Sequence, residues 1–140
     1  MKTYILDTSV VVKWYAPEKE RDFKAAERVF YDLGEGKIIV KTSDLLIHEL
    51  TNALLKGKKL TEEKMTNSLK LFFQTKIEVV SSDLSLIKSA ISLAIKYDLT
   101  AYDAVYVALA KKFSCQLISA NPRCHGKIKD GLVIFLENYQ

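Results

Sequence analysis

The chain has 140 residues, of which 49% are hydrophobic and 27% are charged, and its formal net charge is +4 at pH 7. This length and composition predict a single domain over residues 1–140 with its own apolar core, and they argue against a second domain. Two cysteines without CxxC spacing and only two histidines argue against structural zinc, while the charge is compatible with an acidic polymer as partner without establishing one.

The amino-terminal residues do not predict a signal peptide, because Asp7 and Lys13 interrupt what would be its apolar region. No uncharged stretch approaches the roughly 20 residues that span a bilayer. We therefore expect a soluble, cytoplasmic protein that has no membrane partner. The spacing of Cys115 and Cys124 leaves a disulfide open, and reduced thiols are the expectation for that compartment.

The first half of the chain alternates short apolar β-prone runs with segments of helical periodicity. In chain order it predicts a strand at residues 3–6, a short helix capped by Ser9, a helix at 17–33, a strand at 37–40, and a helix from 42 or 43 to 57. Thr42 or Ser43 is the expected cap of the last of these helices, and Gly57 closes it.

The second half continues the same alternation. It predicts a helix at 61–74, a strand at 77–80, a helix at 82–98, a helix from Thr100, and strands at 115–119 and 132–135. Helical spacing places an inward-facing stripe on the 82–98 helix, made of Leu84, Ile87, Ile91, Ala94 and Ile95. The helix from Thr100 is expected to bury one side, made of Ala104, Val105, Ala108 and Leu109.

Strands that alternate with helices predict an α/β domain with a mainly parallel sheet of four to five strands, because a parallel connection needs a crossover long enough for a helix. The expected sheet core is Ile5, residues 38–40, Val79, Val80, Leu117, Ile118, Val133 and Ile134. In such sheets ligands bind beyond the carboxyl ends of the strands. Asp7 and Asn121 both lie just past such an end.

Three acids stand out because their surroundings are apolar or helix-forming: Asp7, Glu49 and Asp103. Each has an ordinary explanation, since Asp7 suits a turn or cap, Glu49 an exposed helix face, and Asp103 a capping box with Thr100. If the fold brings them together, their mutual repulsion requires a compensating cation. A carboxylate-held Mg²⁺ or Mn²⁺ ion is the leading hypothesis.

The three acids and the phrases around them resemble, in order, the PIN-domain ribonucleases, and in particular the toxin subunits of VapBC-type toxin–antitoxin pairs. "YILDTSVVVKWY" is similar to the first-strand motif, with Asp7 as its acid and Ser9 at the accompanying Ser/Thr position. "SDLLIHELTNALLK" is similar to the helix motif with Glu49. "LTAYDAVYVALAKKFSCQLISAN" resembles the segment that carries the third acid, Asp103.

This resemblance implies a three-layer α/β/α fold and metal-dependent hydrolysis of RNA phosphodiester bonds. Asp7, Glu49 and Asp103 would hold the metal, while Ser9 and Asn121 would orient water or the scissile phosphate. Lys13 and Arg123 are nominated to bind the RNA backbone because they lie closest to these residues in sequence. A small antitoxin and a second copy of the chain are the implied protein partners. Candidate contacts are Tyr15, Tyr31, Tyr102, Tyr106 and Trp14, for which ordinary core or half-buried packing is the favoured alternative.

One position departs from the family pattern. The family usually carries a fourth acid in a phrase like Leu-x-Thr-x-Asp, and this chain has Asn121 there. Asn121 offers a neutral oxygen and removes one negative charge. Three carboxylates suffice for one ion that keeps several waters, whereas a second ion would be held more weakly. Asp98 or Asp130 are alternative fourth acids.

Two other functions remain open at this point. The first is a PIN-like module that has lost efficient catalysis through Asn121 and binds RNA or a protein. The second is a phosphotransfer domain of the receiver or haloacid-dehalogenase type, which also places an Asp at a strand end. The dehalogenase motif needs a second Asp where Ser9 stands, and Asp83 lies too far into a helix to be a receiver's phosphorylated Asp.

Overall fold

Five parallel strands form one sheet in the order β3-β2-β1-β4-β5 in the computed structural model, which describes all residues 1–140. The strands are β1 (Lys2–Leu6), β2 (Ile38–Ser43), β3 (Glu78–Val80), β4 (Gln116–Ser119) and β5 (Val133–Phe135). Register pairs Tyr4 with Val40 on one side and with Gln116 on the other. The predicted parallel α/β sheet is confirmed, and β1 is its central strand.

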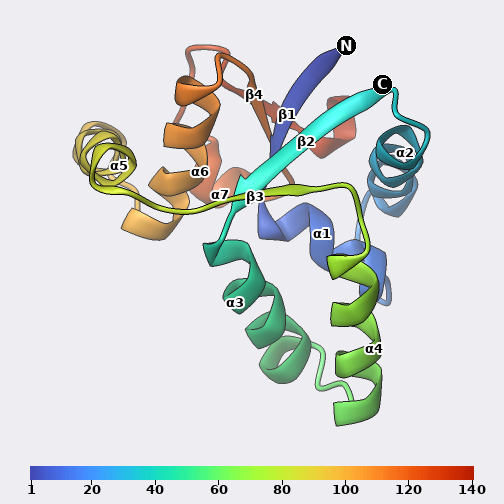
Figure 1. Ribbon diagram of the computed structural model, residues 1–140. Coiled ribbons are helices and arrows are strands. Elements are labelled where there is room, and N and C mark those ends of the chain that lie inside the picture. Colours follow the sequence, from blue (N-terminus) through green and yellow to red (C-terminus); the bar gives the residue numbers. More distant parts are fainter.

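Helices cover both faces of the sheet. They are α1 (Thr8–Tyr15), α2 (Phe23–Gly34), α3 (Leu45–Asn52), α4 (Glu62–Phe73), α5 (Leu84–Tyr97), α6 (Ala101–Lys112) and α7 (Pro122–His125). A π-helical turn, η1 (Ala53–Gly57), extends α3, and a short 3₁₀ helix, η2 (Leu136–Asn138), follows β5. Figure 1 shows α5 and α6 on one side of the sheet, α1 and α2 on the other, and α3 and α4 projecting beyond its lower edge.

Several helix starts follow the predicted caps. The side chains of Thr61 and Thr100 accept hydrogen bonds from the third amide of the helices that they precede, and Asp83 does the same for α5. The prediction that Ser9 caps the first helix was wrong, because Asp7 accepts the Ser9 amide and the helix begins at Thr8. The carboxylate at the strand end is therefore also a helix cap.

Two other starts differ from the prediction for identifiable reasons. The helix expected from residue 17 begins only at Phe23, because Lys19 and Asp22 adopt left-handed backbone conformations that a helix cannot contain. The helix expected after a cap at Thr42 or Ser43 begins at Leu45, because pairing with β3 holds the chain extended through Ser43, and the Ser43 hydroxyl accepts the Leu45 amide over 3.0 Å as a cap does. Sequence periodicity did not indicate the short helix α7.

The core lies around β1 and α6. Ile5, Leu117 and Ile118 are fully buried as predicted, and so is Leu6, whereas Ile39 and Val79 are substantially exposed. β3 is an edge strand that pairs only with β2, so this side of the sheet is covered less completely. Residues 104–110 are all buried because α6 lies between the sheet and α5, so the predicted one-sided burial of α6 was too narrow.

The predicted inward stripe of α5 was wrong. Leu86, Ala90 and Leu93 face α6 instead, and Ala94 is half-buried. The outer face carries four exposed aliphatic side chains, which we call the α5 stripe: Leu84, Ile87, Ile91 and Ile95, exposed by 71%, 37%, 52% and 80%. α5 packs on α6 and not on the sheet, so only the narrow face of α5 that contacts α6 is buried. None of the helices has the length and hydropathy of a membrane-spanning segment.

Candidate active site

The carboxyl ends of β1 and β4 meet at one edge of the sheet, and Asp7 and Asn121 follow these two strands. The Asp7 amide donates to the Ile118 carbonyl over 3.2 Å, so β1 stays paired with β4 up to the acid. The first acid thus lies at the carboxyl edge of the sheet, as its position after the strand predicted. The acid also faces the adjoining turn that leads into α7.

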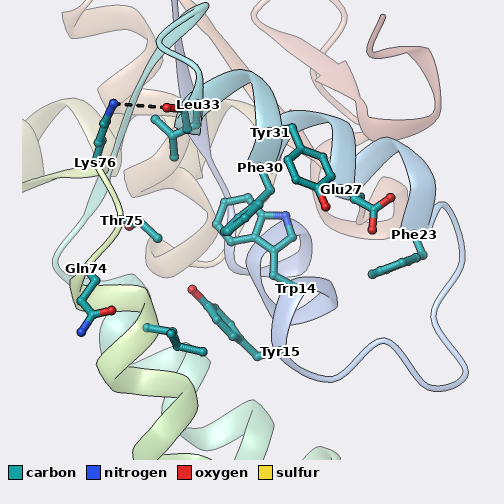
Figure 2. Close-up of a pocket in the computed structure, with 12 residues that line it drawn as sticks. Trp14, Tyr15, Phe23, Glu27, Phe30, Tyr31, Leu33, Gln74, Thr75 and Lys76 are labelled. Carbon is teal, nitrogen blue, oxygen red and sulfur yellow. Dashed lines mark hydrogen bonds between the residues drawn. The ribbon is translucent and has the colours of Figure 1, made fainter.

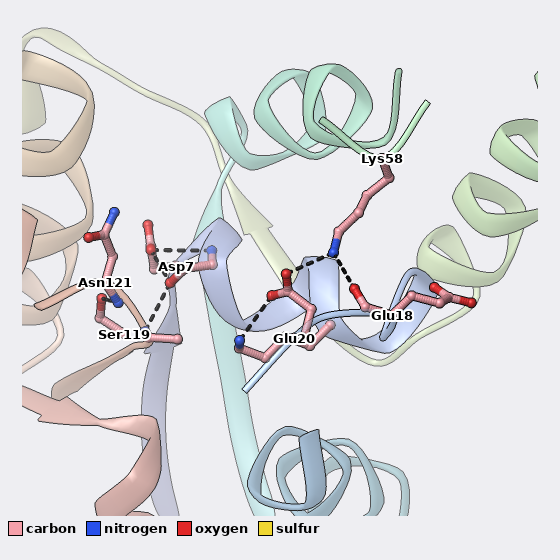
Figure 3. A network of polar contacts seen from close by, with 9 residues as sticks. Asp7, Glu18, Glu20, Lys58, Ser119 and Asn121 are labelled. Atoms are coloured by element: carbon pink, nitrogen blue, oxygen red, sulfur yellow. Dashed lines mark hydrogen bonds and ion pairs between the residues drawn. The ribbon is translucent and has the colours of Figure 1, made fainter. Parts of the chain in front are cut away.

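Ser9 connects the two strand ends. Its hydroxyl donates to Oδ2 of Asp7 over 2.5 Å and accepts a hydrogen bond from the Ala120 amide over 2.9 Å. Its own amide also donates to Asp7 Oδ2, over 3.3 Å. Figure 3 shows these contacts around Asp7, with Ser119 and Asn121 alongside. Both the proton and an acceptor position of the Ser9 hydroxyl are therefore occupied within the chain.

Asp7 carries a charge that its surroundings do not fully compensate. Only 6% of the residue is exposed, and burial raises the pKa of its carboxyl above the ordinary value. His125 and the hydrogen bonds from Ser9 lower this pKa, while the nearby carboxylate of Asp103 raises it. Burial and this repulsion both disfavour the charged carboxylate, and a bound cation would relieve both.

Asp103 lies in the first turn of α6 and takes part in a capping box. The Thr100 hydroxyl donates to Asp103 Oδ2 over 3.0 Å and accepts the Asp103 amide over 3.1 Å. The buried His125 ring links this turn to β4, with Nδ1 2.7 Å from the Ser119 hydroxyl and Nε2 3.4 Å from the Asp103 carbonyl oxygen. The capping role predicted for Asp103 coexists with its place beside Asp7.

Glu49 is held by two hydroxyl groups from other elements. Thr8 Oγ1 donates to Glu49 Oε1 over 2.8 Å, and the hydroxyl of Tyr106 donates to the same oxygen over 2.5 Å. Burial raises the pKa of Tyr106 well above its usual range, and the carboxylates of Glu49 and Asp7 raise it further. Because Thr8 directly follows Asp7, its hydrogen bond brings Glu49 to the start of α1, where Asp7 is the cap.

Asn121 is committed to the helix that it precedes. Its Oδ1 accepts the Cys124 amide over 3.3 Å, and its Nδ2 donates to Cys124 Sγ over 3.1 Å. The alternative acids also have other partners, since Asp98 pairs with Lys127 and Asp130 accepts the Tyr97 hydroxyl. Sequence patterns did not single out Thr8, Tyr106 or His125. Only the position of Thr8 between Asp7 and Ser9 could have drawn attention to it.

The alignment of the chain with known proteins agrees with this geometry. The model of the PIN domain matches residues 4–129. The chain belongs to the PIN-domain family. Ribonuclease VapC3 of Pyrobaculum aerophilum is 33% identical over 119 residues, which are 82% of this chain and 86% of that protein.

Solved PIN-type structures share the fold at low sequence identity. The structure of VapBC2 from Rickettsia felis, bound to a promoter DNA fragment, superposes with a TM-score of 0.72 at 14% identity, covering 95% of this chain and 98% of that one. VapC20 of Mycobacterium tuberculosis, a toxin that cleaves the sarcin–ricin loop, gives a TM-score of 0.65 at 17% identity, covering 81% and 85%. The predicted resemblance to VapC-type PIN domains and the predicted three-layer fold are confirmed.

The donor set of this PIN domain suits a hard divalent cation, although it is not a closed cage. Asp7, Glu49 and Asp103 offer only oxygen ligands, and the buried carboxylate of Asp7 has a raised pKa that a cation would lower. No group of three His, Cys, Asp or Glu side chains converges closely enough to hold an ion without rearrangement or water. Mg²⁺ commonly keeps several waters and binds one or two carboxylates directly, so the residues fit it.

Lys13 does not line an open rim of the site, contrary to the nomination from sequence. It is buried, and its amine pairs with Glu20 over 3.0 Å. Lys58 binds the other oxygen of Glu20 over 2.7 Å and the Glu18 carbonyl over 2.9 Å, as Figure 3 shows. This network ties the loop after α1 to the turn after α3. Arg123 is exposed and stays a candidate for contact with RNA.

A separate aromatic groove lies between α1, α2 and α4 of the PIN domain. Its cavity of about 480 Å³ is lined mainly by Trp14, Tyr15, Phe23, Phe30, Tyr31 and Leu71. Figure 2 shows Trp14 and Phe30 at its centre and the Tyr15 hydroxyl pointing inward. That hydroxyl is buried without a hydrogen-bond partner. Of the tyrosines considered as contacts, Tyr31 is exposed here, Tyr102 is exposed on α6, and Tyr106 belongs to the core.

Proposed function

We propose that the protein is a metal-dependent endoribonuclease and the toxin of a VapBC-type toxin–antitoxin pair, with Asp7, Glu49 and Asp103 as its catalytic and metal-binding acids. The observation that carries the proposal is the buried carboxylate of Asp7, held at the end of the central strand beside Asp103 with a raised pKa. Its relative VapC3 is named a ribonuclease. The likeness to VapC20, a toxin that cleaves the sarcin–ricin loop, agrees in fold.

The chain's own residues would prepare the phosphodiester for in-line attack by water. A Mg²⁺ or Mn²⁺ ion, when bound, supplies activation of water and neutralises charge on the phosphate. Ser9 holds the Asp7 carboxylate and Thr100 holds that of Asp103. Ser9 thereby orients Asp7, and Asn121 keeps α7 in place at the crevice wall. Because the Asn121 side chain is hydrogen-bonded to Cys124, three carboxylates are available as ligands. This number favours one bound ion over two.

The test is cleavage of a structured RNA by purified protein, with Mg²⁺ or Mn²⁺ and with chelator. The wild type should cleave only with metal, and Asp7→Asn should be inactive. Asp130→Asn is the matched control, because Asp130 is an exposed aspartate bonded to Tyr97. Cleavage by Asp7→Asn equal to that of the wild type, or cleavage unaffected by chelator, would contradict the proposal.

A second candidate is a PIN-like module that binds RNA or protein with little catalysis. Two observations favour it. The Asn121 side chain is hydrogen-bonded to Cys124, and the acidic side chains do not form a closed metal site. A wild type that binds RNA without cutting it, together with activity gained by Asn121→Asp, would support the module over the nuclease.

The antitoxin partner is proposed to place an apolar segment in the aromatic groove. The groove is large enough for several side chains, and its lining is aromatic as in protein-binding hot spots. VapBC complexes of known structure give this kind of fold an antitoxin partner. In a bacterial host, co-expression of the product of the neighbouring reading frame should relieve growth arrest by the wild type and not by Tyr31→Glu. Equal relief of both would place the antitoxin elsewhere.

A homodimer is proposed to form through the α5 stripe. Two copies of α5 packed antiparallel about Ile91 would bury the stripe and bring Asp83, at the start of one helix, near Lys96, at the end of the other. Stable interfaces bury about 800 Å² per partner, so the stripe would be the centre of a larger contact. Sedimentation should give a dimer for the wild type and Lys70→Glu, and a monomer for Ile91→Glu. A dimer of Ile91→Glu would contradict this surface.

A further inference from the structure

Each proposed acid is held through one of its oxygens by a hydroxyl group of the chain. Ser9 donates to Oδ2 of Asp7, and Thr100 donates to Oδ2 of Asp103. Glu49 receives two such bonds at Oε1, from Thr8 and Tyr106, whose hydroxyl oxygens are 3.0 Å apart. Glu49, with the longest side chain of the three acids, is thus held by the hydroxyl groups of two different residues.

The donors of Glu49 come from two rigid parts of the fold. Thr8 is the first residue of α1 and follows the central strand, while Tyr106 is fully buried in the middle of α6. The Tyr106 ring cannot turn away without disturbing the core between the sheet and α5. Its hydroxyl has Glu49 as its acceptor, and Oε2 of Glu49 accepts no hydrogen bond from another side chain or from the backbone. The geometry therefore fixes one oxygen and presents the other.

We infer that Tyr106, together with Thr8, is a positioning residue that holds Oε1 of Glu49 so that Oε2 is presented to the divalent cation. The inference rests on the proposed function, because it assigns Glu49 to the metal. A glutamate side chain that is already ordered loses less conformational entropy when it binds an ion. Groups that orient metal ligands in this way change metal affinity by about 10–100-fold when they are removed.

The test measures Mn²⁺ binding directly, by the electron paramagnetic resonance signal of unbound Mn²⁺. Tyr106→Phe keeps the buried ring and removes the hydroxyl, and it should weaken Mn²⁺ binding about tenfold. Tyr139→Phe is the matched control, because Tyr139 is also buried and donates to a carboxylate, Asp32, over 2.7 Å outside the site. It should bind Mn²⁺ as the wild type does.

A double-mutant cycle separates positioning from general disturbance of the core. In the Glu49→Gln background, Tyr106→Phe should cause no further loss of Mn²⁺ affinity, because the carboxylate that it positions is absent. Thr8→Val serves as the second variant if Tyr106→Phe does not fold, and it should likewise weaken binding only when Glu49 is present. Cleavage by Tyr106→Phe should recover at saturating Mn²⁺.

Two results would overturn the inference: Mn²⁺ affinity unchanged in both Tyr106→Phe and Thr8→Val, or an equal loss of affinity with and without Glu49. Failure of the proposed function has a different signature. A wild type that binds Mn²⁺ with the expected coupling between Tyr106 and Glu49 but cleaves no RNA would support the positioning role and contradict the nuclease. A wild type that binds no Mn²⁺ would overturn both.

Discussion

The Asp7 carboxylate should make the metal-free protein less stable than it would be with a neutral side chain of the same shape. Asp7→Asn keeps an oxygen that can accept from both the amide and the hydroxyl of Ser9, so the cap of α1 survives. The substitution removes a buried charge and its repulsion by Asp103, at the cost of its attraction to His125. We therefore expect Asp7→Asn to be more stable than the wild type.

The size of this gain follows from the same contacts. The residue is 94% buried, because 6% of its surface is exposed, and the repulsion by Asp103 adds to the desolvation of its charge. Single stabilising substitutions commonly add about 0.5–2 kcal/mol to the free energy of unfolding, and the burial of this charge places Asp7→Asn in the upper part of that range, at about 1–2 kcal/mol. In a domain of this size that corresponds to a rise in Tm of about 3–6 °C.

The gain should depend on pH in a direction set by the raised pKa. Between the ordinary value of 3.8 and the raised folded value, the folded wild type binds more protons at Asp7 than the unfolded chain does. The free energy of unfolding of the wild type therefore falls as pH rises through that window, and the whole loss due to Asp7 is present above it. Asp7→Asn lacks this titration, so its advantage should be small near pH 4 and largest near neutral pH.

The assay is urea unfolding of both proteins in EDTA at several pH values, followed by circular dichroism. Asp83→Asn is the matched control, because Asp83 is exposed and its carboxylate caps the first turn of α5, so loss of its charge should not increase stability. Added Mn²⁺ should stabilise the wild type more than Asp7→Asn. The reasoning is refuted if metal-free Asp7→Asn is less stable than the wild type near neutral pH.

Three further predictions concern other parts of the chain. Gly126→Ala should lower stability by about 1–3 kcal/mol in urea unfolding, because an added Cβ would lie 2.3 Å from a backbone oxygen of α7. Gly57→Ala is the control and should be close to neutral, because no atom lies within 4 Å of the added Cβ. Tyr15→Phe should raise Tm by about 3 °C in calorimetry, since its buried hydroxyl has no partner; a lower Tm would contradict this. Burial raises the pKa of the thiols of Cys115 and Cys124, so iodoacetamide labelling at pH 8, followed by mass spectrometry, should be slower in the folded than in the unfolded protein.

The sequence was sufficient for the elements whose signals are local. Strand runs, the caps at Thr61 and Thr100, and the alternation of strands with helices all depend on neighbouring residues, and they were predicted. Features that depend on tertiary packing were not. The periodicity of α5 did not reveal which face is buried, because the helix has more apolar residues than one face can hold. The small Ala90 faces α6, whereas the larger Ile95 is exposed.

The same distinction holds for the site. The order of Asp7, Glu49 and Asp103 and their motifs indicated a family, and strand-end position indicated the edge of the sheet. The hydroxyl groups of Thr8 and Tyr106 could not be assigned, because they meet Glu49 only through contacts between residues 41 and 57 positions apart. The commitment of Asn121 to Cys124 likewise depends on α7, a helix too short for a periodic signal.

The position of β1 at the centre of the sheet has a consequence for how the protein can be controlled. Central strands exchange their amide hydrogens only when the whole domain unfolds, whereas edges and termini open locally. Asp7 and the hydrogen bond from the Ala120 amide to Ser9 lie at the ends of β1 and β4, two of the three inner strands, so local opening of the edge strands leaves them in place. Such a site is silenced by covering it or by destroying the protein, and an inhibitor that only loosens the periphery would leave it active.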